Sequence, residues 1–150
     1  MDITITGTRD ISRDAAYYEE LFEWFLAPFA EDGHAFWVGG AVGIDTVALG
    51  WLTVRQAPVT VVVPATVEDQ PATASSLIRR VHDAKLAELV ELKHPSPPQA
   101  DAYHARNRYM VDRSEFVIGF PKRGEQSGGT WYTLGYAAAK ELPRLIIPVS

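Results

Sequence analysis

Short β-branched runs alternate with longer segments of helical periodicity along the chain. Residues 2–7 alternate apolar and polar side chains and predict a first strand. Further strands are predicted at 36–38, 59–63, 88–92, 116–120 and 145–149, and helices at 12–30, 44–55, 74–82, 99–113 and 130–141. Strands that alternate with helices predict a Rossmann-like three-layer α/β/α fold, with a mostly parallel sheet of about five to six strands.

Two glycine-rich turns, 38–45 and 126–133, each join a predicted strand to a predicted helix. Glycine has no Cβ, so an anion can approach the backbone N–H groups closely. The following helix directs the positive end of its dipole to the same place. Because the carboxyl ends of parallel strands meet at one edge of the sheet, the two turns predict one phosphate-binding crevice.

The predicted helix 12–30 is rich in aromatic residues, and Ser12 or Asp14 is its expected N-cap. Tyr18, Phe22, Phe25 and Phe29 follow helical spacing, and Tyr17, Leu21 and Trp24 widen the apolar face. This face is more apolar than one core contact requires. It predicts a homodimer or a higher homo-oligomer.

Composition narrows the class of protein. A length of 150 residues with 47% hydrophobic and 22% charged residues predicts one globular domain. The chain has no cysteine, which excludes disulfides and thiolate chemistry and fits a cytoplasmic location. No apolar run is long enough for a transmembrane helix, and no spacing of His, Asp and Glu predicts a metal site. The net charge of -5 argues against broad nucleic-acid binding but leaves room for a local basic site.

Four segments together carry a resemblance to a known superfamily. They are Thr6–Arg9, Gly39–Ala48, Arg106–Met110, and the turn Ser127–Thr130 with Thr133. In this order they resemble the SLOG superfamily of Rossmann-like domains. That superfamily includes the Smf/DprA DNA-processing proteins, the Lonely Guy (LOG) hydrolases and the YspA/YpsA-type proteins. The small single-domain YspA-like group is nearest in length, so residues 1–150 are expected to form a single nucleotide-binding domain.

The resemblance and the chemistry of the residues imply the same site. The backbone of Gly128, Gly129 and Thr130 is expected to hold a phosphate, Arg9 and Arg106 to bind its oxygens, and Asp45 to accept from a ribose hydroxyl or to cap its helix. The predicted ligand-binding residues are Gly7, Thr8, Arg9, Gly39, Gly40, Gly43, Asp45, Arg106, Asn107, Ser127, Gly128, Gly129, Thr130 and Thr133. His104 lies near Arg108 on one helix turn and is the one histidine for which both a surface position and a place facing the crevice stay open. Trp131 and Tyr132 either stack on a base or pack behind the turn.

Three functions follow as hypotheses. The first is a sensor or carrier of a small-molecule nucleotide such as AMP or ADP-ribose. The second is a LOG-like phosphoribohydrolase, although threonine or glycine stands where that family has its glutamate. Asp45 and Arg106 are then the candidate catalytic residues, with Glu125 as a substitute acid. The third is a DprA-like single-stranded DNA-binding module, carried by the cations Arg106, Arg108, Arg113, Lys122 and Arg123.

Overall fold

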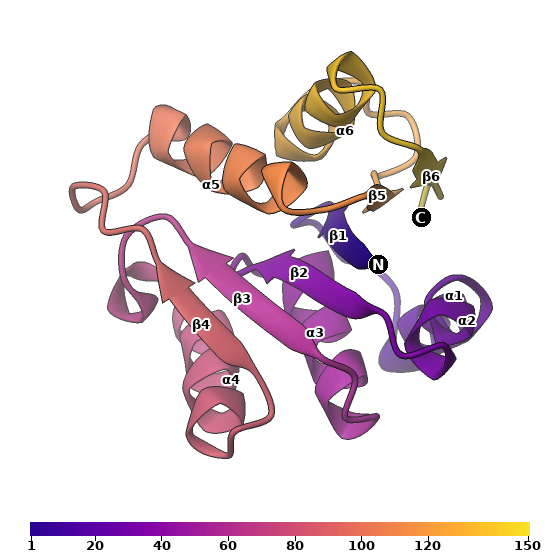
Figure 1. Cartoon of the computed structure of the whole chain (residues 1–150), viewed down its shortest axis with the longest axis horizontal. Helices are drawn as coiled ribbons and strands as arrows, with labels where there is room; N and C mark the ends of the chain where they lie inside the picture. Colours follow the sequence, from indigo (N-terminus) through magenta and orange to yellow (C-terminus); the bar gives the residue numbers. More distant parts are fainter.

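Six parallel strands form one sheet in the computed structural model, which describes residues 1–150 (Figure 1). The strand order is β4-β3-β2-β1-β5-β6, and every pairing is parallel. The strands are β1 Asp2–Gly7, β2 Ala35–Gly39, β3 Val59–Val63, β4 Glu88–Glu91, β5 Phe116–Phe120 and β6 Arg144–Ile146. The predicted α/β fold is confirmed.

Helices cover both faces of the sheet, which gives the three predicted layers. One face packs against α1 Ala15–Phe25, α2 Ala27–Glu31, α3 Ile44–Val54 and α4 Ala72–Asp83. The other face carries α5 Ala100–Asp112 and α6 Gly129–Ala139 (Figure 1). A short 3₁₀ turn, η1 Val67–Asp69, precedes α4.

The central strands are the most apolar. In β1, Ile5 is fully buried and pairs with Val38 of β2 and Ile118 of β5. The edge strand β4 carries glutamate at both ends and is only partly buried, as its weaker apolar pattern predicts.

The segment predicted as one helix over 12–30 is two helices that meet at Leu26. Pro28 lies in the first turn of α2 and has no N–H group to continue the hydrogen bonds of α1. The start of α1 agrees with one of the two predicted caps, because Asp14 Oδ1 accepts from the Tyr17 N–H over 3.1 Å.

The last strand is shorter than the predicted 145–149. The regular ladder of β6 ends at Ile146, although the Ile147 and Val149 N–H groups still donate to the Gly119 and Pro121 carbonyls, each over 2.8 Å. Beyond it, Val149 forms only an isolated bridge with Lys122.

The aromatic face of α1 is divided between core and surface. Phe22 is 1% exposed and packs edge-on against Phe120 and Trp51, with ring centroids 5.5 and 6.1 Å away. Trp24, by contrast, is 71% exposed. The predicted homo-oligomer stays a prediction. None of the helices combines the length and the apolar character that crossing a membrane requires.

The sheet has one topological switch point, between β1 and β5. The chain leaves β1 toward one face through α1 and leaves β5 toward the other face through α6. The two connections separate at the carboxyl ends of these strands, where a crevice forms.

Candidate functional site

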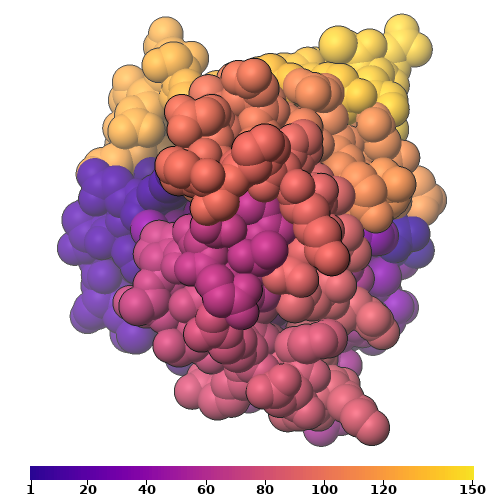
Figure 2. Space-filling view, turned by 90° about the vertical axis from the view of Figure 1, so that its left-hand side faces the viewer, coloured from indigo at the N-terminus to yellow at the C-terminus, as the bar shows by residue number.

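A cavity of about 460 Å³ lies at this switch point. Three distant segments border it: the end of β1, the helix α5 and the turn before α6. Figure 2 views the molecule from this edge, with the first segment in indigo, α5 in orange and the turn in light orange. The predicted residues that line the cavity are Gly7, Thr8, Arg9, Asp45, Arg106, Asn107, Ser127, Gly128, Gly129 and Thr130.

The second glycine turn opens α6 directly onto this cavity. Gly128 is the N-cap, with φ +102°, a backbone conformation that favours glycine. No side chain caps the helix, and a Cβ at Gly128 or Gly129 would meet open space. The first N–H groups of a helix have no partner within it, so this end of α6 is suited to an anion.

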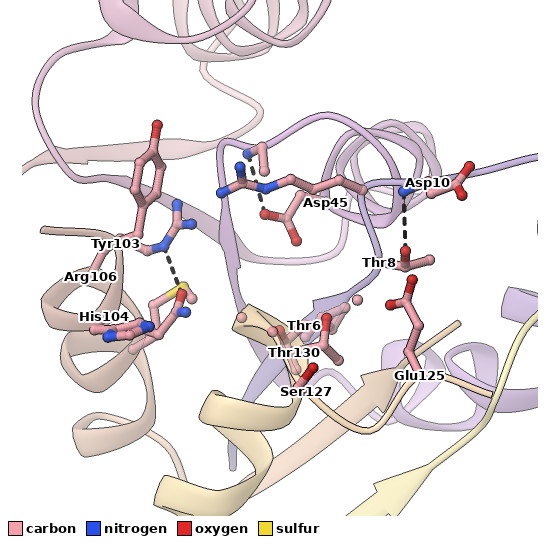
Figure 3. A pocket seen from close by; sticks show the side chains of 18 of the residues that line it. Thr6, Thr8, Asp10, Asp45, Tyr103, His104, Arg106, Glu125, Ser127 and Thr130 are labelled. Atoms are coloured by element: carbon pink, nitrogen blue, oxygen red, sulfur yellow. Dashed lines mark hydrogen bonds between the residues drawn. The ribbon is translucent and has the colours of Figure 1, made fainter. Parts of the chain in front are cut away.

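Two threonine side chains add hydroxyl groups near the same helix end (Figure 3). Thr6, at the end of β1, is 7% exposed, and no protein group hydrogen-bonds its hydroxyl. Thr130 lies in the first turn of α6. Because the Thr6 hydroxyl is accessible from the cavity and has no protein partner, a ligand or solvent molecule there can bind it.

The first glycine turn is closed by the protein itself. A Cβ at Gly43, which has φ +87°, would lie 2.4 Å from the Thr8 carbonyl oxygen. That carbonyl accepts the Ile44 N–H over 3.0 Å and so occupies the N-terminus of α3. From this turn only Ala41 and Asp45 line the cavity, and Gly39, Gly40 and Gly43 lie behind it in packing contacts.

Gly39 lets two charged side chains approach the backbone of β2. A Cβ at this position would lie 2.6 Å from both Arg106 Nη1 and Asp45 Oδ2. A Cβ at Gly40 would lie 2.6 Å from Val63. The glycines of the first turn therefore bring the site's charged residues together rather than facing the cavity.

Arg106 reaches the site from α5 and is 3% exposed. Its Nε donates to Asn107 Oδ1 over 2.8 Å, and its Nη1 donates to the Val62 carbonyl over 3.1 Å. Burial lowers the pKa of the Arg106 guanidinium, while the negative charge of Asp45 opposes that change.

Asp45 lies in the first turn of α3 and is 7% exposed. Its Oδ2 accepts the Ala41 N–H over 3.2 Å, so the carboxylate braces the glycine turn while it lines the cavity. Burial raises the pKa of the Asp45 carboxyl, and the positive charges of Arg106 and Arg9 oppose this rise.

Tyr103 is a cavity residue that the sequence analysis missed. Its ring lies beside two guanidinium groups, with 4.9 Å from its centroid to Arg9 Cζ and 5.6 Å to Arg106 Cζ. The signal in the sequence is its position one helical turn before Arg106. The sequence alone does not predict that Arg9 lies beside the Tyr103 ring as well.

Two predicted neighbours of the site connect α5 and α6. His104 lines the cavity and stacks on Tyr132, with ring centroids 3.9 Å apart and planes 10° apart. The Tyr132 hydroxyl accepts from Arg108 over 2.7 Å, so Tyr132 joins the helices instead of facing the cavity. Thr133 is fully buried and donates to the Gly129 carbonyl over 2.9 Å, also outside the cavity.

Carboxylates also border the cavity. Asp10 lines the cavity and forms an ion pair with Lys122, and Glu125 lies in the turn before α6 (Figure 3). No group of three or more His, Cys, Asp or Glu side chains is arranged to hold a metal ion. The site therefore combines a helix N-terminus and arginines with carboxylate acceptors.

An open parallel sheet with a crevice at its switch point defines a Rossmann-like domain, as predicted, and the family match that follows is consistent with the SLOG superfamily. The model of the DNA recombination-mediator protein A family matches residues 1–150, and the chain belongs to that family. None of the curated proteins matches the sequence.

Two solved structures share the fold. DNA processing protein A from Helicobacter pylori, a structure that concerns its single-stranded DNA binding mode, is 19% identical with a TM-score of 0.75. DprA from Streptococcus pneumoniae is 21% identical with a TM-score of 0.75. The matches cover 100% and 99% of this chain but only 66% and 50% of those chains.

Proposed function

We propose that this chain binds single-stranded DNA, with one phosphodiester of the strand at the N-terminus of α6. The observation that carries the proposal is the uncapped start of α6 at Gly128, which opens onto a cavity that also contains Arg9 and the unpartnered Thr6 hydroxyl. Backbone N–H groups, a guanidinium and hydroxyls are the donors that phosphate oxygens accept.

The family supports this reading over the other two. The chain belongs to a family of DNA recombination mediators, and the Helicobacter pylori relative binds single-stranded DNA. The net charge of -5 fits a local contact rather than a broad basic surface. Of the cations, Arg9 lines this cavity, and Lys122 and Arg123 lie on the loop after β5, whose Glu125 also borders the cavity.

A pair of glycines in α6 gives a matched test. Gly129 faces the cavity, whereas Gly135 lies about one and two-thirds turns further along the same helix, and a Cβ meets open space at both. We expect Gly129→Leu to weaken binding of a labelled oligonucleotide by at least about tenfold, since its side chain fills the phosphate position. Gly135→Leu should bind like the wild type. Equal binding by all three proteins would refute the site.

Salt dependence tests the phosphate contact itself. Binding that releases counterions weakens as salt rises, with a slope of about −0.7 per phosphate contact for single strands. Arg9→Ala should make that slope shallower by about 0.7, which corresponds to the loss of one phosphate contact. A slope that does not change in Arg9→Ala would show that Arg9 contacts no phosphate.

A small-molecule nucleotide is the second candidate, supported by the size of the cavity. Its volume of about 460 Å³ lies in the range of small-ligand sites, and Asp45 offers an acceptor for a ribose hydroxyl. AMP or ADP-ribose would then raise the melting temperature of the wild type but not of Gly129→Leu. Release of free base from AMP, lost in Asp45→Asn, would further identify a phosphoribohydrolase.

A further inference from the structure

A second cavity, of about 480 Å³, lies on the other side of the loop that precedes α6. Glu125 borders both cavities, so they adjoin at this residue. The first turn of α6 also faces both, because Thr130 lines the first cavity and Trp131 lines the second. A polymeric ligand that extends from the first cavity across this loop therefore reaches the second cavity.

Trp131 presents a fixed aromatic surface to the second cavity. Its Nε1 donates to the Glu125 carbonyl over 2.8 Å, which sets the orientation of the indole and uses its only donor. The side chain also packs against a small core cluster that contains Val117 and Leu134. What remains for a ligand is a half-buried ring in a cavity that Pro121 and Pro148 also line.

The charge at this cavity is set by Arg123. Its backbone N–H donates to the Val149 carbonyl over 2.7 Å, which fixes the base of the loop, while its side chain is exposed and forms no ion pair. Lys122, the other cation here, is already paired with Asp10. An aromatic ring and an unpaired guanidinium that line one cavity are the combination that stacks a base and contacts an adjoining phosphate.

We propose that the second cavity is a nucleotide subsite, in which Trp131 stacks on the base next to the phosphodiester at α6 and Arg123 contacts the following phosphate. This proposal rests on the proposed function and makes it more specific. The preferred ligand is then a single strand of two or more nucleotides rather than a single nucleotide. Glu125, at the boundary, places a negative charge beside the path of the strand.

The test compares ligands of two lengths on full-length variants. A labelled oligothymidylate and unlabelled thymidine 5′-monophosphate are titrated, the second by competition. We expect Trp131→Leu, which preserves the apolar packing, to weaken oligonucleotide binding by about 5- to 100-fold and to leave the monophosphate unaffected. Trp131→Phe should retain most of the affinity, and Glu125→Gln should bind the oligonucleotide more tightly.

Arg123→Ala provides an independent measurement, because its side chain is exposed and its loss does not threaten the fold. It should lower the salt slope for the oligonucleotide and not for the monophosphate. Wild-type affinity in both Trp131→Leu and Arg123→Ala, with binding lost in Gly129→Leu, would overturn the second subsite and leave the first intact. Absence of oligonucleotide binding by the wild type at low salt would overturn the proposed function itself.

Discussion

Arg106 holds the side-chain amide of its neighbour Asn107 in one orientation. The Arg106 Nε donates to Asn107 Oδ1 over 2.8 Å, and a guanidinium can only donate, so the amide oxygen must face it. The Asn107 NH₂ group is then the end left for the cavity, which Asn107 lines while 7% exposed. Arg106 is thus a positioning residue, and Asn107 is the donor that it presents to a ligand.

Asn107→Asp tests whether Asn107 is the donor that faces a ligand. Aspartate has nearly the same shape and can still accept from Arg106, so we expect the melting temperature to change little. It replaces two donors with a negative charge, which should weaken oligonucleotide binding by about 10- to 100-fold. Fluorescence anisotropy and a thermal melt on the same sample separate the two effects. Unchanged affinity would show that Asn107 makes no contact with the strand.

Arg106→Lys tests whether Arg106 positions the Asn107 side chain. Lysine keeps the charge but lacks the planar fork that reaches both Asn107 and the Val62 carbonyl. We expect a loss of stability of about 1–3 kcal/mol, because buried acceptors lose their partner. Binding should weaken as well, and to a similar degree as in Asn107→Ala. Chemical denaturation measures the stability, and a wild-type midpoint would contradict the positioning role.

Gly39→Ala should destabilise the fold without adding anything to the cavity. Its Cβ would lie 2.6 Å from Arg106 Nη1 and from Asp45 Oδ2, and such overpacking costs about 1–3 kcal/mol. Gly135→Ala is the control, because a Cβ there meets nothing within 4 Å and alanine favours a helix by about 1 kcal/mol over glycine. The two variants should shift the unfolding midpoint in opposite directions.

Much of the fold is predictable because strand and helix periods are local properties. The β-branched run of Val59–Val63 and the apolar run of Phe116–Phe120 occur as strands with the predicted bounds. The break at Leu26 was missed because helical aromatic spacing continues across it, although Pro28 marks it. A proline two residues into a helix is compatible with the helix, so its position matters more than its presence.

The site is predictable only in part because its contacts join distant residues. The glycine pattern correctly identified both strand-to-helix turns, but not that the Thr8 carbonyl would occupy the first one. Gly39 and Gly128 have similar sequence surroundings. Gly39 nevertheless makes room for Arg106, whereas Gly128 faces open space. Tyr103 was missed because its partner Arg9 is far away in the chain.

The buried carboxyl of Asp45 predicts a pH dependence of stability. Burial raises its pKa above the ordinary value of 3.8. Between that value and the raised pKa, the folded state binds more protons than the unfolded state, so this group's contribution to stability falls as pH rises. In Asp45→Asn, whose amide oxygen can still accept from Ala41, this slope should disappear. Denaturant unfolding of both proteins between pH 3 and 7 measures the difference.

The same carboxyl predicts how oligonucleotide affinity depends on pH. A protonated Asp45 removes one negative charge from the cavity, so affinity should rise as pH falls through its raised pKa. An oligothymidylate is the suitable probe, because its phosphodiesters keep their charge over this range. His104, on α5, lines the same cavity, so His104→Gln is measured in parallel as a control. If Asp45 carries the effect, the slope persists in His104→Gln and vanishes in Asp45→Asn, and a slope that persists in Asp45→Asn would contradict the prediction.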